Sequence, residues 1–125
     1  MNFPEELFYT EEHEWIKIED GYAYVGITDF AQNELGDIVY LDVDCLDLHL
    51  RRDDVFGTVE AVKTVSDLFL PVSGKVVEIN SYVVNNASYL NDDPYENWII
   101  KIEISDMDDI SSLLKRDEYT SLIGV

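Results

Sequence analysis

Lys63 is the residue that most clearly suggests a chemical role. It lies in the segment 57–67 and is one of only 8 Lys and Arg residues in a chain of 125. Strand-like, β-branched sequence on both sides predicts a β-hairpin with this lysine at its tip. Such a position suits a lysine that carries a covalent group, because a modifying enzyme must reach both the amine and its neighbours. We expect Glu60, Val62 and Asp67 to be the recognition features around Lys63.

The arrangement resembles the attachment hairpin of lipoyl domains, so the expected cofactor is lipoate bound covalently to Lys63. Lipoic acid on a lysine forms a long arm whose strained dithiolane accepts electrons or an acyl-type group by thiol–disulfide exchange. One alternative is an ordinary surface lysine whose charge discourages aggregation of the hairpin. A biotin carrier is less well supported, because no methionine lies beside Lys63, whereas methionines typically flank a biotinyl lysine.

No other set of residues predicts catalysis. The chain has no Gly-rich phosphate loop, no nucleophile elbow and no spacing typical of metal ligands. His13 and His49 lie in unrelated segments, and we expect each to be solvated or hydrogen-bonded at the surface. Glu11, Glu12 and Glu14 form a charge cluster whose simplest interpretation is a solvated entrance to a strand. We therefore expect a carrier without catalytic residues and without a metal site.

The net charge of −19 and the pI of about 4.1 argue against several classes of partner. Nucleic acid is disfavoured because the chain offers no basic surface to displace phosphate counterions, and an anionic membrane face is disfavoured for the same reason. Partners with basic docking surfaces are favoured, and their association would be steered by charge and sensitive to salt. The same acidity favours a monomer.

Cysteine content and hydrophobicity bear on the compartment. The lone Cys45 excludes an intrachain disulfide and fits a reducing environment. No apolar run approaches the roughly 20 residues of a membrane span. The acidic first residues are unlike a signal peptide or a basic presequence. We expect a cytoplasmic location, and a processed form in the mitochondrial matrix fits the sequence as well.

The segments around Lys63 predict one mainly β domain over residues 1–125. Alternating or continuous apolar runs predict strands at 14–19, 22–27, 38–43, 75–79 and 98–104. Thr28 as a cap and Gly36 as a stop predict a short helix over 28–35. We expect a lead-in at residues 1–13, a long connection at residues 80–97, and two short helices after residue 104.

The fold class that we expect is a flattened β-barrel/sandwich hybrid of the lipoyl/biotinyl-domain type, with short helices that include C-terminal helices. The segments 36–41 and 74–79 share the pattern Gly-x-Ile/Val-Val-x-Leu/Ile. This internal similarity is consistent with a domain built from two similar halves.

Motifs along nearly the whole chain resemble the glycine cleavage system H protein family. Residues 9–15 are similar to its opening Tyr-Thr-x-x-His-Glu-Trp, and residues 25–32 to its Val-Gly-Ile-Thr-Asp-aromatic-Ala-Gln. Residues 56–63 resemble the lipoyl-lysine segment Phe-Gly-x-Val-Glu-Ser-Val-Lys, with Ala61 in place of the serine. The segments 66–80, 91–95 and 98–102 follow the family as well.

The resemblance implies a lipoylated shuttle without enzymatic activity of its own. It would carry the aminomethyl group of glycine from glycine decarboxylase (the P protein) to an aminomethyltransferase (the T protein). Dihydrolipoyl dehydrogenase (the L protein) would reoxidise the arm. A lipoate ligase or a lipoyl/octanoyl transferase would attach lipoate to Lys63. In this family the loaded arm rests in a surface cleft near the His-Glu-Trp strand, which makes Glu14 and Asp67 the candidates for contacting its cationic amine.

Departures from the family pattern keep other functions open. Residues 44–47 replace the usual Pro-x-x-Gly, Asp53 replaces a glycine, and Thr64-Val65 replaces two small residues after the lysine. One alternative is a relay protein that supplies lipoate to 2-oxoacid dehydrogenases or to another redox system. Another is an unmodified interaction module that has lost the arm.

Overall fold

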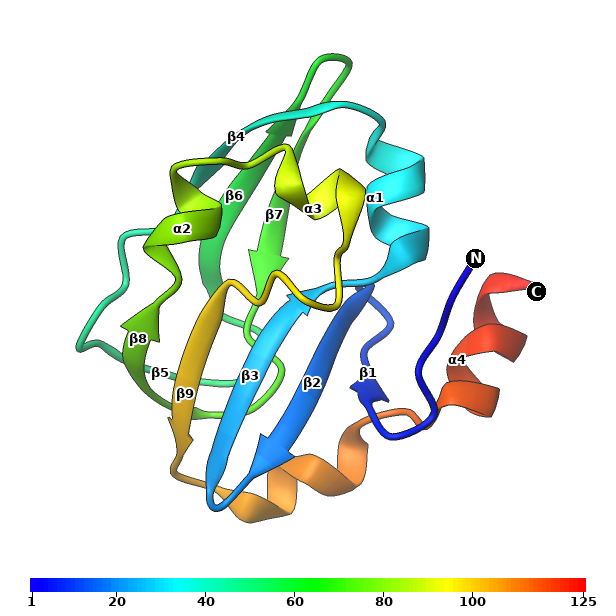
Figure 1. Ribbon diagram of the computed structural model, residues 1–125. Helices are drawn as coiled ribbons and strands as arrows, with labels where there is room; N and C mark the ends of the chain where they lie inside the picture. The colour runs from blue at the N-terminus through cyan, green and yellow to red at the C-terminus, as the bar shows by residue number, and fades with distance from the viewer.

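Two antiparallel sheets form the body of the protein, as Figure 1 shows for the computed structural model of residues 1–125. The strands are β1 Phe8–Tyr9, β2 Glu14–Glu19, β3 Tyr22–Ile27, β4 Ile38–Asp42, β5 His49–Leu50, β6 Val55–Ala61, β7 Val65–Phe69, β8 Gly74–Ile79 and β9 Ile100–Ile104. The larger sheet has the order β1-β2-β3-β9-β8-β5, and the smaller has the order β4-β6-β7. The predicted mainly β sandwich with short helices is confirmed, although the strands do not close into a barrel.

Alternating side chains from both sheets build one core of 19 buried residues. In β9, Ile100 and Ile102 are fully buried, while Lys101 between them points to the outside of the larger sheet. The smaller sheet contributes inward side chains such as Val59 and Leu68. Because only one face of each sheet packs into the core, a shift of one residue would expose the buried set, so burial fixes the register of both sheets.

The turn between β2 and β3 lies at Asp20-Gly21, where the sequence predicts it. The two residues have φ angles of 53° and 83°. A two-residue hairpin turn requires such left-handed angles, which Asp and Gly adopt readily. The strands pair from Glu19 opposite Tyr22 to Glu14 opposite Ile27. Glu14 is therefore placed at the end of β2 that lies farthest from the turn.

Helix α1 (Asp29–Leu35) follows β3 and begins and ends as predicted. The hydroxyl of Thr28 accepts a hydrogen bond of 3.1 Å from the N–H of Ala31, which caps the helix. Gly36 ends it with a φ of 74°. The connection from α1 to β4 then passes close to the hairpin of β6 and β7 (Figure 1).

Two short helices, α2 (Ser81–Val84) and α3 (Tyr89–Asp92), lie in the segment that the sequence predicts only as a long connection. Each contributes one fully buried residue to the core, Val83 and Leu90. Helices of this length have little intrinsic stability, so the burial of these two side chains is what stabilises them. None of the helices has the length and apolar character needed to cross a membrane.

The two ends of the chain pack together beside the larger sheet. The segment predicted as a lead-in contains β1, and Tyr9 pairs with Leu114 through two backbone hydrogen bonds of 2.8 Å. The two helices predicted after residue 104 are present as a 3-10 helix, η1 (Met107–Ser112), and as α4 (Arg116–Ile123). The fully buried Tyr119 stacks on Tyr9 with ring centroids 4.8 Å apart. Its hydroxyl lies 2.8 Å from that of Thr28, which ties α4 to the cap of α1.

Candidate functional site

The hairpin of β6 and β7 stands out from one end of the molecule (Figure 1) and has Lys63 at its tip. A hydrogen bond of 2.8 Å from the N–H of Ala61 to the carbonyl of Thr64 closes the turn. Lys63 is exposed, and none of the ion pairs in the protein includes it. The predicted hairpin is therefore confirmed, and the lysine at its tip is exposed to solvent.

The tip is held by the loop between α1 and β4. The N–H of Val62 donates to the carbonyl of Asp37 at 2.9 Å. Gly36 lies against the lysine, because a Cβ at this position would be 3.5 Å from Lys63 Cε and 3.9 Å from its Nζ. Glycine also suits the φ of 74° at this position. The sequence did not reveal this role of Gly36 and Asp37, since its signals there indicated the end of a helix and the start of a strand.

The three residues predicted to be recognised with Lys63 are all exposed on the hairpin. Glu60 lies near the end of β6 and pairs across the strands with Val65. Val62 directly precedes the lysine and is 75% exposed. Asp67 lies farther along β7, opposite a residue of β6 that is closer to the core end of the hairpin. The structure therefore brings Glu60 and Val62 to the tip and leaves Asp67 on the flank.

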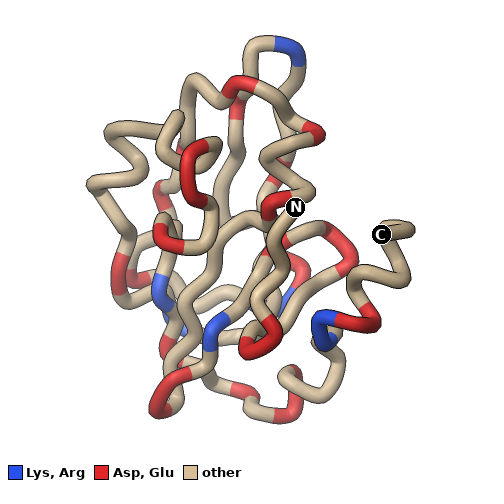
Figure 2. The backbone as a smooth tube through the Cα atoms, turned by 45° about the vertical axis from the view of Figure 1, so that its right-hand side comes forward, with Lys and Arg blue, Asp and Glu red and all other residues tan.

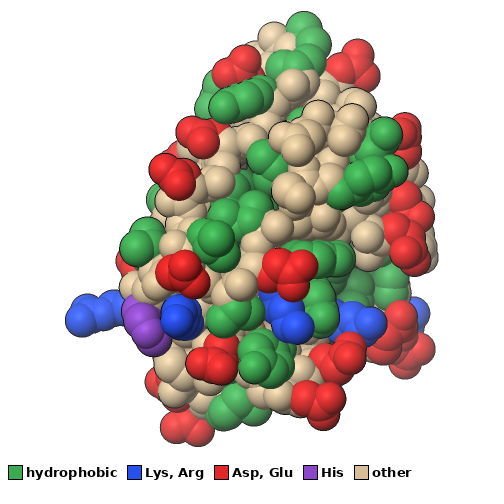
Figure 3. Space-filling model, turned by 60° about the vertical axis from the view of Figure 1, so that its left-hand side comes forward, with side chains coloured by type: hydrophobic (Ala, Val, Ile, Leu, Met, Phe, Trp, Pro, Cys, Tyr) green, Lys and Arg blue, Asp and Glu red, His purple; other side chains and the backbone are tan.

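Positive charge is scarce at the hairpin end of the molecule. In Figure 2 one blue segment marks the hairpin, and the other Lys and Arg segments lie in the lower half. Figure 3 shows the same segregation from another side, where basic and histidine side chains form a belt across the lower part and none lies above it. Asp37, Glu60 and Asp67 are exposed on the hairpin or on the loop beside it. Lys63 is thus a cation on an acidic end of the protein.

A cleft of about 470 Å³ lies at the foot of the hairpin, where Glu14 and Phe69 are among its lining residues. Glu14 is only 2% exposed, so its interpretation as part of a solvated strand entrance is wrong. Its carboxylate accepts hydrogen bonds from the hydroxyl of Thr10 at 2.6 Å and from the N–H of Phe69 at 3.3 Å. Burial raises the pKa of Glu14 to about 7, although these two hydrogen bonds act in the opposite direction.

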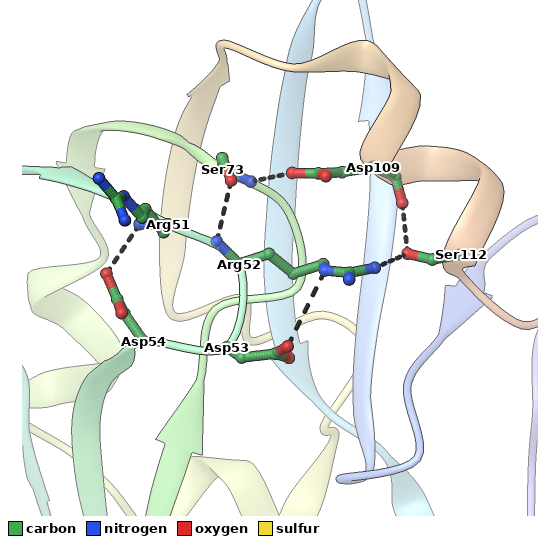
Figure 4. A network of polar contacts seen from close by, with 7 residues as sticks. All are labelled: Arg51, Arg52, Asp53, Asp54, Ser73, Asp109 and Ser112. Atoms are coloured by element: carbon green, nitrogen blue, oxygen red, sulfur yellow. Dashed lines mark hydrogen bonds and ion pairs between the residues drawn. The ribbon is translucent and has the colours of Figure 1, made fainter.

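A polar network holds another wall of this cleft (Figure 4). The N–H of Arg52 donates to the hydroxyl of Ser73 at 2.9 Å, and the N–H of Ser73 donates to the Asp109 carboxylate at 2.8 Å. The Arg52 guanidinium contacts Ser112 and lies 3.9 Å from the carboxylate of Asp53. Arg52 is the only basic residue that lines the cleft, against the acidic Glu11, Glu12, Glu14 and Asp53. The cleft therefore favours a cationic guest.

The structure separates Glu14 from Lys63. β7 leads from the tip to the cleft, and an extended chain from Lys63 to Phe69 spans about 20 Å. Asp67 does not line the cleft, but it lies on the same face of β7 as Phe69, because alternate residues of a strand share a face. Asp67 therefore lies on β7 between the tip and the cleft.

A two-sheet sandwich that presents an exposed lysine on a braced hairpin defines a carrier domain of the lipoyl type. Comparison with known proteins gives the family. The family model described as Glycine cleavage H-protein matches residues 7–124. The chain belongs to the glycine cleavage H-protein family, whose members are the lipoyl carriers of the glycine cleavage system.

Individual relatives agree with this assignment over the full length of the chain. Two proteins named glycine cleavage system H protein, from Staphylococcus epidermidis strains ATCC 12228 and RP62A, are 50% and 49% identical over 125 residues. Each match covers 99% of this chain and 99% of the relative. The crystal structure of a glycine cleavage system H protein from Mycobacterium marinum has a TM-score of 0.91 at 34% identity, covering 98% of this chain and 100% of that one. None of these findings favours the alternative of a lipoate relay.

Proposed function

We propose that Lys63 carries lipoate through an amide bond and that the chain acts as a non-catalytic carrier between the enzymes of the glycine cleavage system. The observation that supports this most directly is the exposed amine of Lys63, which has no ion-pair partner, on a braced hairpin tip. In attachment, Nζ of Lys63 bonds to the carboxyl carbon of an activated lipoyl donor, the donor's leaving group departs, and the amine loses a proton. A lipoate ligase or a lipoyl/octanoyl transferase supplies that donor.

The residues around Lys63 fit this group. The lysine stem lies beside Gly36, which has no side chain, and the exposed neighbours leave an approach for an enzyme. When bound, lipoate would supply a reducible disulfide, one sulfur of which could carry the aminomethyl group of glycine. The protein presents the arm in turn to glycine decarboxylase, to the aminomethyltransferase and to dihydrolipoyl dehydrogenase.

The cleft that contains Glu14 is the proposed resting place of the loaded arm. Its lining is mainly acidic, and the protonated amine of an aminomethyl group is a cation. An ammonium group beside Glu14 would favour the ionised carboxylate and so lower the pKa of Glu14 from its value of about 7. Asp67, on the route from the tip to the cleft, adds a second carboxylate along the path of the arm.

The outer face of the hairpin is the proposed docking surface for these enzymes. Tyr40, Val62 and Val65 are 56%, 75% and 62% exposed on it or beside it. Exposed apolar side chains gathered beside Glu60 and Asp67 combine an apolar contact area with negative charge. A partner with a basic rim around an apolar centre complements this surface.

Association with the decarboxylase is expected to weaken by about tenfold when the salt concentration rises from about 20 to 200 mM. The reason is the net charge of −19 together with the acidic character of the hairpin end. The affinity is measured by calorimetry or surface plasmon resonance over this range of salt. An affinity that stays flat would show that charge contributes little to docking.

Mass spectrometry of the protein isolated from its own host tests the attachment itself. We expect one lipoyl adduct per chain, and peptide mapping should place it on the peptide that contains Lys63. An adduct on another lysine would overturn the site. Native protein without any adduct, from cells that lipoylate other proteins, would overturn the proposed function and favour an unmodified interaction module.

A further inference from the structure

We propose that Asn91 is a positioning residue for the lysine at the hairpin tip, which it holds through the loop at residues 36–38. The inference rests on the proposed attachment role of Lys63. Asn91 belongs to α3, which lies beside α1 and the loop that leaves it (Figure 1). Asn91 begins the segment 91–95 that follows the family pattern, but that resemblance does not indicate what the side chain does, and asparagines are common throughout residues 80–97.

The side chain of Asn91 forms hydrogen bonds with the backbone on both sides of Asp37. Its Nδ2 donates to the carbonyl of Gly36 at 2.8 Å, and its Oδ1 accepts from the N–H of Ile38 at 2.9 Å. A third contact, from Nδ2 to the Gln32 Oε1 at 3.1 Å, adds a link to α1. One amide group therefore pairs with this loop as the backbone of a neighbouring strand would.

The residue enclosed by these two bonds is the one that holds the tip. The carbonyl of Asp37 accepts the hydrogen bond of 2.9 Å from the N–H of Val62, which directly precedes Lys63. Gly36 has no side chain and a φ of 74°, so its backbone has more freedom to rotate than that of other residues. Fixing Gly36 and Ile38 removes that freedom and aims the Asp37 carbonyl at the hairpin.

Asn91 does not hold its own helix. All of its side-chain hydrogen bonds leave α3 for α1 or for the loop, and the buried Leu90 supplies the packing of α3. Asn97 provides the contrast, because its Nδ2 donates to the carbonyls of Tyr89 and Asp93, at 3.0 and 2.8 Å. These acceptors belong to α3 and its end. The side chain of Asn91 thus bonds to the loop and to α1, whereas the side chain of Asn97 bonds to α3 and its end.

Asn91→Ala and the matched control Asn97→Ala separate these roles. Amide exchange of Val62 is measured by NMR, with Ile102 as an internal reference, and lipoylation kinetics are measured with a purified lipoate ligase and unlipoylated protein. Loss of the Asn91 hydrogen bonds to Gly36 and Ile38 is expected to accelerate amide exchange at Val62 about tenfold. It is also expected to raise the KM of the ligase for the protein about fivefold, with kcat unchanged. The effect falls on KM because the ligase must then order the tip on binding. Asn97→Ala should leave both measurements within about twofold of wild type.

Wild-type exchange at Val62 together with a wild-type KM in Asn91→Ala would overturn the proposal. Equal effects in Asn97→Ala would also overturn it, because they would trace to the stability of α3. If Asn91→Ala does not fold, Asn91→Asp is measured instead. It keeps an acceptor for Ile38, loses the donor to Gly36, and is expected to accelerate Val62 exchange as well. Absence of lipoylation on wild-type Lys63 would refute the proposed function, and Val62 exchange would still decide whether Asn91 holds the tip.

Discussion

Replacing Lys63 with arginine is expected to abolish lipoylation completely and to leave the fold intact. Arginine keeps the positive charge, but its guanidinium is not deprotonated in proteins and does not act as the acylated amine. The side chain of Lys63 is exposed, and its neighbour Gly36 is not in the core, so replacing it breaks no ion pair and removes no buried packing. The free energy of unfolding should change by less than about 0.5 kcal/mol. Intact mass after incubation with ligase and lipoate measures the first effect, and thermal denaturation measures the second.

Lys17→Arg is the matched control for this experiment. Lys17 is also an exposed strand-region lysine, but it lies on β2 of the larger sheet and pairs with Glu19. Lys17 should accept no lipoate, so Lys17→Arg, which keeps Lys63, should be lipoylated like the wild type. Lipoyl incorporation that persists in Lys63→Arg would contradict the assignment of the site. A variant that unfolds would show that the lysine supports the hairpin rather than merely projecting from it.

Replacing Glu14 with glutamine is expected to stabilise the protein at pH 8 but not at pH 4. The gain at pH 8 should reach up to roughly 3 kcal/mol, given a pKa raised from 4.5 to about 7. Each kcal/mol corresponds to roughly 4 °C in Tm for a domain of this size. Glutamine keeps an oxygen that can accept from the N–H of Phe69, and it carries no charge. The Tm of both proteins measured from pH 4 to pH 8 gives the difference directly.

The sign of this pH dependence follows from proton binding. Below pH 4.5 the carboxyl of Glu14 is protonated in both the folded and the unfolded chain, so its titration contributes no difference. Between 4.5 and about 7 the folded protein keeps a proton that the unfolded chain has released. Stability therefore falls as the pH rises through this window, and the full cost of an ionised, buried carboxylate is present above it. Glutamine removes that cost.

Glu11→Gln serves as the control for the Glu14 variant. Glu11 also lines the cleft, but it is exposed. The same loss of one negative charge at an exposed position should change the stability by less than about 0.5 kcal/mol at every pH. A difference between Glu14→Gln and wild type that does not vary with pH would mean that Glu14 titrates in the folded protein as it does in the unfolded chain.

Strong local patterns made most of the fold predictable from the sequence. The strands β2, β3 and β9 follow the alternation of apolar and polar residues, and the Asp20-Gly21 turn and the Thr28 cap have direct sequence signals. The helices α2 and α3 were not predicted, because each depends on one buried side chain rather than on helix propensity. Likewise, β1 was not predicted, because it is only two residues long: it pairs with β2 at Ile16 and Trp15, and Tyr9 also bridges to the distant Leu114.

The sequence predicted only those parts of the candidate site whose role follows from the type of residue and its local sequence. The exposed lysine was predictable because Lys63 is the one cation in a sequence typical of a hairpin. The structure places Lys63 at the hairpin tip. The burial of Glu14 was not predictable, because the adjacent Glu11 and Glu12 suggest a solvated cluster and the cover comes from β7 and from the loop of Arg52. The hydrogen bonds of Asn91 to the loop at residues 36–38 were not predictable from the sequence either, since Asn91 is far from that loop along the chain.

The hydrogen bond between Thr28 and Tyr119 bears on when, during its synthesis, the protein becomes ready for acylation. These residues lie 91 positions apart, and the hydroxyl of Tyr119 completes the surroundings of the α1 cap. A ribosome releases Thr28 long before Tyr119 has been made, and β9 must also arrive late to take its place between β3 and β8. Such distant pairings make folding wait for the later segments. A nascent chain that already displays its lysine would therefore still lack the finished support beneath it, so acylation is expected to follow translation rather than accompany it.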